Sequence, residues 1–156
     1  MVYEPPPVTP DALRAMLTEE WTTIPLRIPG GWEVRSNGLI ARLLPSGECE
    51  VSDSEDLIWL AKSPPPNDKP YETDPTSPWR ELQVDLGCYG AKGEDAMIGT
   101  PGWDGCYRLV LLEPDWDHQT ASWTGKDIYE AIAMLQRWLH TLSWTGALTP
   151  DLVTTD

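Results

Sequence analysis

The sequence predicts an α+β fold, in which a single antiparallel sheet of about five or six strands packs against an N-terminal and a C-terminal helix. Short segments of alternating apolar and polar residues fill the middle of the chain, and amphipathic helical patterns stand near its two ends. The length of 156 residues fits one domain, 1–156, with a single core. A hydrophobic fraction of 40% with nine tryptophans is too apolar for a disordered chain.

The first predicted helix begins at Thr9. The Thr9 side chain can cap the helix, and Pro10 suits the first helical position because its missing N–H is not needed there. The prolines and glycines of residues 25–31 end the segment. Between these limits one apolar stripe recurs at helical spacing: Leu13, Met16, Leu17 and Trp21.

Residues 32–52 predict a three-stranded antiparallel meander, with strands at 32–35, 39–44 and 48–52. The turns between these strands are Asn37-Gly38, a dipeptide typical of tight hairpins, and Pro45-Ser46-Gly47. The next segment, 54–61, is compatible with two structures. It is either one helical turn capped by Ser54 or a buried strand.

The second half of the predicted sheet contains three strands. Leu82, Val84 and Leu86 alternate with polar residues, which indicates a half-buried strand, and the more uniformly apolar segment Cys106–Leu112 indicates a central one. Residues 118–123 are expected to pair back on this central strand across the turn at 113–115. Two loops interrupt the pattern: 62–78, with six prolines in seventeen residues, and 87–105, with six glycines in nineteen.

The C-terminal helix is predicted from a sustained apolar stripe. Thr124 and Asp127 have the spacing of a capping box with Asp in the place of the usual Glu, and Gly146 and Pro150 mark the end. Residues 149–156 are expected to fray as a tail. The stripe consists of Ile128, Ala131, Ile132, Leu135, Leu139 and Leu142. The residues expected on the opposite, solvent-facing side are Lys126, Glu130, Gln136, Arg137 and His140.

The charge of the chain excludes several classes of partner. Its 11 Lys and Arg residues against 25 Asp and Glu residues give a formal net charge of −14, and the isoelectric point is about 4.3. Such a chain repels phosphate backbones and anionic membranes, so we expect no direct nucleic-acid or membrane partner. We see no signal-peptide pattern and no spanning apolar run, and three scattered cysteines are expected to be free thiols. These features predict a cytoplasmic protein.

No motif specifies a reaction, and we expect neither an enzyme nor a bound cofactor or metal. The glycine-rich segment lacks the Gly-Lys-Ser/Thr ending of a phosphate loop. Cys88 lies on that segment and is the best candidate for a reactive thiol, although no histidine partner is identifiable. One functional hypothesis is a metal-dependent enzyme built on Asp115, Asp117 and His118, but a solvated turn explains the same residues without a metal.

Acidic residues and tryptophans together predict a binding surface. Carboxylates without compensating bases can steer a basic partner, and a tryptophan inside a ring of acids is typical of an interface hot spot. A solvated acidic surface, with loop tryptophans that only cover the core, is the alternative explanation. Tryptophans expected in the core are Trp21, Trp59, Trp123 and Trp138, and those expected in turns are Trp79, Trp103, Trp116 and Trp144. The predicted partner-binding residues are Glu48, Glu50, Asp53, Glu55, Asp56, Trp103, Asp104, Asp115, Trp116 and Asp117.

The leading hypothesis is a small acidic, non-enzymatic binding protein that neutralises a basic protein partner, such as a toxin, a nuclease or a defence protein. Bacterial immunity proteins, antitoxins and phage-encoded inhibitors of host defence share these general traits, although no sequence motif links this chain to them. The acids of residues 48–56 would steer the partner, and Trp103 and Trp116 would dock. One alternative is a small-molecule or carbohydrate binder with a pocket of loop tryptophans between the two loops, and another is a subunit of a larger assembly.

Overall fold

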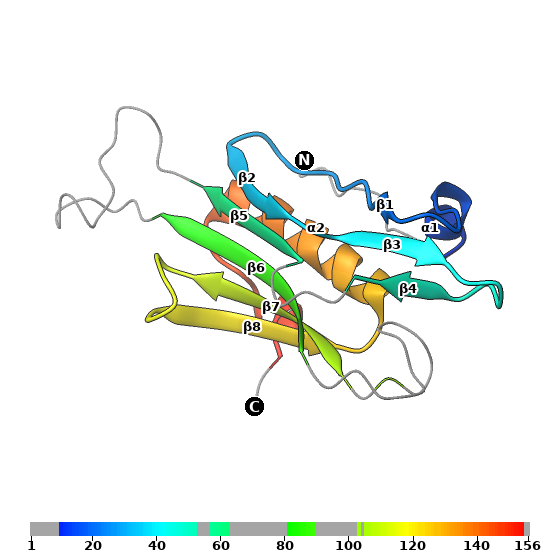
Figure 1. Cartoon of the computed structure of the whole chain (residues 1–156). Helices are drawn as coiled ribbons and strands as arrows, with labels where there is room; N and C mark the ends of the chain where they lie inside the picture. Colours follow the sequence, from blue (N-terminus) through cyan, green and yellow to red (C-terminus); the bar gives the residue numbers. More distant parts are fainter. Residues whose placement is uncertain (1–9, 53–56, 63–80, 90–102, 104, 155–156) are drawn as a thin grey trace, which may run out of the picture.

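The computed structural model describes residues 10–52, 57–62, 81–89, 103 and 105–154. In this part of the chain, two antiparallel sheets and one long helix form the fold (Figure 1). The smaller sheet has the order β1-β3-β4, with strands at Thr22–Thr23, Ile40–Leu43 and Cys49–Val51. The larger sheet has the order β2-β5-β6-β7-β8, with strands at Trp32–Asn37, Ile58–Lys62, Leu82–Tyr89, Cys106–Leu112 and Gln119–Gly125. The helices are α1 at Pro10–Met16, α2 at Ile128–Thr145 and a 3-10 helix, η1, at Pro150–Leu152.

The prediction of a single sheet was wrong, because the chain changes sheet at Asn37-Gly38. The Gly38 N–H donates to the Leu57 carbonyl at 2.7 Å, and Asn37 Oδ1 accepts from the Leu39 N–H at 3.2 Å. These bonds and the fully buried Leu39 side chain hold a crossing between sheets in place of a hairpin turn. As a result β2 pairs with β5, and β3 pairs with β1 and β4. The predicted meander is correct only for β3 and β4.

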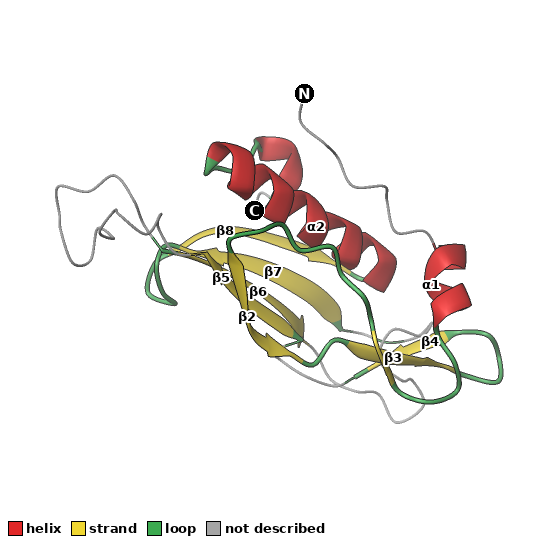
Figure 2. Ribbon diagram, turned by 90° about the horizontal axis from the view of Figure 1, so that it is seen from above, coloured by secondary structure: helices red, strands yellow, loops and turns green. Residues whose placement is uncertain are grey.

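One face of the five-stranded sheet is covered by α2 (Figure 2). The apolar stripe predicted for this helix is buried, and β7 adds Tyr107, Leu109 and Leu111 to the same core. The predicted strands around β6, β7 and β8 are confirmed, and the ambiguous segment forms strand β5 from Ile58. Strand β6 is buried on both faces, however, since Asp85 is only 2% exposed. None of the described helices is long and apolar enough to cross a membrane.

Two details of the C-terminal helix differ from the prediction. Its N-cap is Asp127, not Thr124, because the Asp127 carboxylate accepts from the N–H groups of Tyr129 and Glu130 at 2.7 and 3.4 Å. Gln136 is buried instead of solvent-facing, and its Oε1 accepts from the Arg27 N–H at 2.9 Å. This bond ties the segment before β2 to the helix.

The N-terminal helix is shorter than predicted and does not lie on the five-stranded sheet. Helix α1 ends at Met16 and lies beside the start of α2 and the three-stranded sheet (Figure 2). Beyond it, the Thr18 carbonyl accepts from the Leu43 N–H of β3 at 2.7 Å, and Thr18 Oγ1 accepts from the Glu20 N–H at 3.1 Å. Because these bonds replace helical ones, Trp21 leaves the predicted stripe and is 45% exposed.

The C-terminal tail is held in place as far as Thr154, so the prediction of a frayed 149–156 was wrong for that part. Leu152 is buried, and its carbonyl accepts from Trp138 Nε1 at 2.6 Å. The Thr154 N–H donates to the Ser122 carbonyl of β8 at 2.8 Å. Gly87 and Cys88 belong to strand β6 and not to a loop. The predicted loops 62–78 and 87–105 otherwise lie almost entirely outside the described residues.

Candidate functional site

The structure separates the residues predicted to bind a partner. Of these residues, Asp53, Glu55, Asp56 and Asp104 lie outside the described residues, as does Trp79, which was predicted to lie in a turn. The turn that joins β7 to β8 lies at one end of the five-stranded sheet, whereas β4, which follows Glu48, lies at the opposite end of the molecule (Figure 1). Glu48 and the carboxylates of the β7–β8 turn therefore do not form one continuous surface.

Glu50 belongs to an internal ion pair and not to a steering surface, which corrects the sequence-based assignment. Its carboxylate accepts from Arg42 Nε at 2.9 Å and the residue is 7% exposed. The Arg42 guanidinium in turn lies 4.8 Å from the centre of the Trp21 ring. Arg42 and Glu50 stand directly opposite each other on β3 and β4. Their opposite charges on the predicted hairpin were a signal that could have indicated this pair.

Trp103 is buried and cannot dock with a partner in this conformation, which corrects a second assignment. It is 6% exposed, and its ring centre lies 5.0 Å from that of the buried Tyr107. A Cβ atom on Gly105 would lie 2.3 Å from the Trp103 ring, so only glycine leaves room for this packing. The predicted docking by Trp103 fails because the ring belongs to the core.

The turn at residues 113–118 retains the predicted combination of an exposed tryptophan between exposed acids. Trp116 is 47% exposed, and Asp115 and Asp117 on either side of it are exposed as well. The Glu113 N–H donates to the His118 carbonyl at 3.0 Å, and the His118 N–H donates to the Asp115 carbonyl at 2.9 Å. These two backbone bonds close the turn, which includes a cis peptide between Glu113 and Pro114.

Side chains of strands β5 and β6 support the turn through hydrogen bonds. Gln83 Nε2 on β6 donates to the Pro114 carbonyl at 2.7 Å, and Gln83 Oε1 accepts from Trp59 Nε1 on β5 at 2.8 Å. The Trp59 ring is stacked under the Arg35 guanidinium, with 5.4 Å from its carbon to the ring centre. Sequence reasoning missed this support, because its members lie 24 to 31 residues apart and no local pattern connects them.

The electrostatics of the turn keep Asp115 ionised. A side-chain hydrogen bond to His118 is the main cause that lowers the pKa of the Asp115 carboxyl, and the bond from the Asp117 N–H lowers it further. His118 Nδ1 lies 2.8 Å from Asp115 Oδ1, and the Asp117 N–H donates to the same oxygen at 3.0 Å. Since an ionised carboxylate only accepts, His118 carries its hydrogen on Nδ1. The turn thus presents fixed negative charge beside Trp116.

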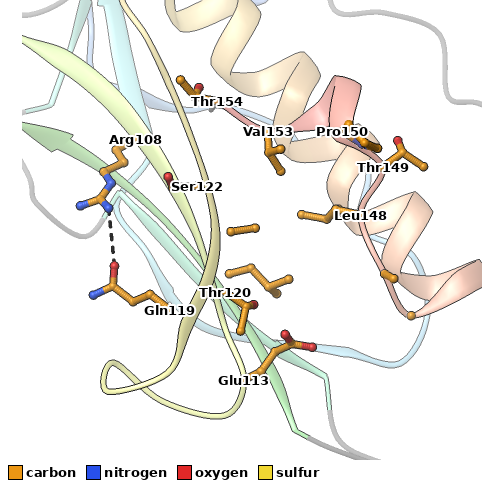
Figure 3. Close-up of a pocket in the computed structure, with 14 residues that line it drawn as sticks. Arg108, Glu113, Gln119, Thr120, Ser122, Leu148, Thr149, Pro150, Val153 and Thr154 are labelled. Carbon is orange, nitrogen blue, oxygen red and sulfur yellow. Dashed lines mark hydrogen bonds between the residues drawn. The ribbon is translucent and has the colours of Figure 1, made fainter. Parts of the chain in front are cut away.

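A cleft lies next to the turn, between β8 and the segment that follows α2 (Figure 3). Its volume is about 630 Å³. No tryptophan lines it, so it is not the pocket of loop tryptophans considered from the sequence. The lining residues are Arg108, Leu111, Glu113, 119–122, 146–150, Val153 and Thr154.

The thiols and the candidate metal ligands do not form a reactive centre within the described ranges. Cys88 is 5% exposed and faces the core, which does not suit a nucleophile that must meet a substrate. Burial raises the pKa of the Cys49 thiol to about 11, which opposes thiolate formation. Across the described segments, no three His, Cys, Asp or Glu side chains group closely enough to hold a metal ion, and this includes Asp115, Asp117 and His118.

Comparison of the chain with protein-family models, with curated proteins and with solved structures finds no significant match in any of the three. The function therefore has to be inferred from the site itself.

Proposed function

We propose that this protein is a small acidic, non-enzymatic binding protein that neutralises a basic protein partner, with the 113–118 turn as a central contact. The observation that carries the proposal is the exposed Trp116 ring between the exposed carboxylates of Asp115 and Asp117, on a turn closed by hydrogen bonds. An aromatic anchor with charged neighbours is the usual composition of an interface hot spot.

The hydrogen bonds that hold the turn support this proposal. Association costs free energy when loops must be ordered, and a loop that is already held in one conformation avoids part of that cost. The bonds from Gln83 to the Pro114 carbonyl and from the Asp117 N–H to Asp115 order the backbone around Trp116 before any partner arrives. A tryptophan that served only to cover the core would not need an exposed position.

The charge of the chain supports a basic partner. A formal net charge of −14 attracts a positively charged protein over several ångströms and accelerates its encounter. Neutralisation would then follow when the bound protein covers the basic active or nucleic-acid-binding surface of the partner. Immunity proteins, antitoxins and phage inhibitors of host defence act in this general manner, which is a likeness of class and not of sequence.

A cytoplasmic location is part of the proposal. Cys49, Cys88 and Cys106 are all free thiols in the structure. A reducing compartment would maintain them in that state.

The test begins with capture of the partner from a native lysate at low salt, followed by kinetics with the purified pair. Trp116→Ala should raise the dissociation rate about 10- to 30-fold with little change in the association rate. Trp144→Ala is the matched control, since Trp144 is 61% exposed but has no acidic neighbour in sequence. Asp115→Asn with Asp117→Asn should slow association at about 0.05 M salt and have little effect at about 0.5 M.

Two results would contradict the proposal. One is an identified partner that dissociates from the Trp116→Ala variant at the same rate as from the unmodified protein. The other is an association rate that does not depend on salt, because steering between opposite charges has to weaken when ions screen them.

A further inference from the structure

Strand β8 is an edge of the five-stranded sheet, and part of its backbone is covered. Among the described strands it pairs with β7 alone. On the opposite side of β8, Thr154 forms hydrogen bonds with two backbone groups of the strand. The Thr154 N–H donates to the Ser122 carbonyl at 2.8 Å, and Thr154 Oγ1 accepts from the Thr124 N–H at 3.0 Å. The C-terminal segment thus imitates an added strand over one end of β8.

The remaining part of the β8 edge forms a wall of the cleft. Four consecutive residues, 119–122, line this cleft, although successive side chains of a strand point to opposite faces of the sheet. A cleft that meets all four therefore runs along the backbone edge, which is irregular at Thr120 because Ala121 and Gln119 pair with consecutive residues of β7. Figure 3 shows this arrangement, with Gln119 and Ser122 on one side of the strand and Thr120 on the other. Since the Ser122 carbonyl points outward to Thr154, the Ser122 N–H points outward as well.

The two edges of the sheet differ in their protection against an added strand. Strand β2, the opposite edge, carries the charged residues Glu33 and Arg35. Strand β8 has the sequence Gln-Thr-Ala-Ser-Trp-Thr-Gly, without a charge or a proline. Both edge strands contain a register shift, β2 at Arg35 and β8 at Thr120, so bulges do not distinguish the two edges. Charged residues and prolines are other common devices that prevent strand addition at sheet edges. Their absence from β8 is consistent with an edge that is used.

We propose that an extended basic segment of the protein partner adds as a further strand along residues 119–122 of β8. This inference rests on the proposed function, because it names the part of the partner that the protein grips. Charge favours a basic segment: Glu113 lines the cleft, and Asp115 and Asp117 precede β8 in the adjoining turn. Arg108, the single cation in the lining, lies on the other side of β8 from Glu113 (Figure 3) and donates to Gln119 Oε1 at 3.5 Å.

The shape of the cleft defines the segment further. Alternate side chains of an added strand would rest on Ala121, Leu148 and Val153, which are only partly buried and line the side next to α2. Small apolar residues at every second position fit that surface. The four residues 119–122 correspond to about 13 Å of strand. The Ser122 carbonyl at one end of this stretch already accepts from Thr154, so the Ser122 N–H is the group left to the added strand. Lys or Arg at the end nearest the turn would meet its carboxylates.

The first experiment titrates the full-length, ¹⁵N-labelled protein with defined peptides. The probe is an octapeptide with two lysines at each end and Val-Thr-Val-Thr between them, which places lysines near the turn in either strand direction. The same peptide with glutamates in place of lysines, and a version with both valines N-methylated, are the matched controls. We expect the lysine peptide to change the amide chemical shifts of residues 119–122 and to slow hydrogen exchange of the Ser122 amide. Each control peptide should bind about tenfold more weakly.

A pair of variants tests the same site from the side of the protein. Thr120 is exposed, so its replacement should leave the thermal unfolding midpoint nearly unchanged. Thr120→Lys should weaken binding of the lysine peptide about tenfold, because it places a like charge on the edge. Thr120→Glu should bind it at least as well as the unmodified protein. Equal binding by the two variants would overturn the inference.

The other outcomes separate this inference from the proposed function. Shifts confined to residues 113–118, or equal binding of the N-methylated peptide, would overturn strand addition and leave binding through the turn intact. A Ser122 amide that, without peptide, becomes more protected from exchange as the protein concentration rises would show pairing between two copies of the chain and would overturn strand addition by a partner. No binding of the lysine peptide overturns it as well. A different outcome is a partner whose dissociation rate Trp116→Ala does not change, while the lysine peptide still protects the Ser122 amide from exchange. That outcome would refute only the role of the turn and leave strand addition in place.

Discussion

Two regions of the molecule combine a tryptophan with carboxylates, and they use the combination in opposite ways. In the three-stranded sheet, Arg42 lies between Trp21 and Glu50 and contacts both. In the turn between β7 and β8, Asp115 and Asp117 flank Trp116, and no lysine or arginine of the described chain lies within ion-pair distance of either acid. The first region is neutralised internally, whereas the second keeps its charge available.

This difference shows that an acidic residue near a tryptophan indicates a binding site only when its charge is not consumed within the protein. Glu50 is 7% exposed, and a partner would have to compete with Arg42 for its carboxylate. Asp115 and Asp117 are exposed, and their contacts with each other and His118 shape the turn without adding a permanent cation. We therefore expect substitutions in the first region to change stability and those in the second to change binding.

The largest expected effect is on stability, from Arg42→Ala. This change leaves the Glu50 carboxylate buried without its partner and removes the cation from the Trp21 ring. We expect a loss of about 2–3 kcal/mol in the free energy of unfolding, measured by urea denaturation. Arg137→Ala is the control, because its ion pair with Asp151 is exposed and should contribute less than about 0.5 kcal/mol. Equal effects of the two substitutions would contradict the distinction between the regions.

The next effect concerns the support of the turn. Gln83→Leu removes the acceptor of Trp59 Nε1 and the donor to the Pro114 carbonyl. We expect a loss of about 1–2 kcal/mol, together with faster hydrogen exchange of the Glu113 amide. Gln119→Leu removes only long bonds, one from Arg108 at 3.5 Å and one to the Trp116 carbonyl at 3.4 Å, and should cost less than about 0.5 kcal/mol with a smaller change in the Glu113 exchange than Gln83→Leu causes. Unchanged exchange in Gln83→Leu would show that the turn is rigid without this support.

A third prediction compares the exposed tryptophan of one region with that of the other. Trp21→Ala removes a stacked arginine contact and should cost about 1 kcal/mol of stability. Trp116→Ala should cost less than about 0.5 kcal/mol, because the bonds that hold its turn come from other groups. Thermal and urea unfolding of both variants, beside the dissociation rates proposed above, would show whether stability and binding separate as expected. A larger loss of stability for Trp116→Ala than for Trp21→Ala would reverse the comparison.

The smallest effect is the response of the turn to acid. The hydrogen bond with His118 lowers the pKa of Asp115 in the folded protein below the ordinary value of 3.8. The folded state therefore binds the proton more weakly than the unfolded state, so its stabilising contribution is present above pH 3.8 and is lost as the pH falls through the folded pKa. A ¹³C titration of the Asp115 carboxyl should show a midpoint below 3.8, and His118→Gln should move it upward. A midpoint at or above 3.8 in the unmodified protein would contradict this account.

Local patterns in the sequence were sufficient to predict several elements. The uniformly apolar segment Cys106–Leu112 is an internal strand, and the stripe from Ile128 to Leu142 is the buried side of α2. Both patterns depend on residues within a few positions of each other, which is the range that helical and strand periodicity covers. The exposed Trp116 with its neighbouring acids was predicted for the same reason, since a turn of six residues is a local structure.

Pairing between distant segments could not be predicted in this way. Asn37-Gly38 is a typical hairpin dipeptide, yet the backbone bond from Gly38 to Leu57, nineteen residues further on, converts it into a crossing between two sheets. Gln136 has the spacing of a solvent-facing residue, but the Arg27 N–H lies against it and makes burial favourable. In each case a group from elsewhere in the chain decides which hydrogen bond is made.

The sequence by itself determined the charge, the periodicity of the main strands and the long helix, and the local turn that carries Trp116. The tertiary structure decided which acids and tryptophans are accessible: it buried Trp103 beside Tyr107, paired Glu50 with Arg42, and left Asp115 and Asp117 exposed. It also placed β8 at the edge of the described five-stranded sheet, where Thr154 covers one end of that strand. The physical reason is that periodicity reflects neighbours along the chain, whereas exposure and charge pairing depend on the residues that folding brings from far away.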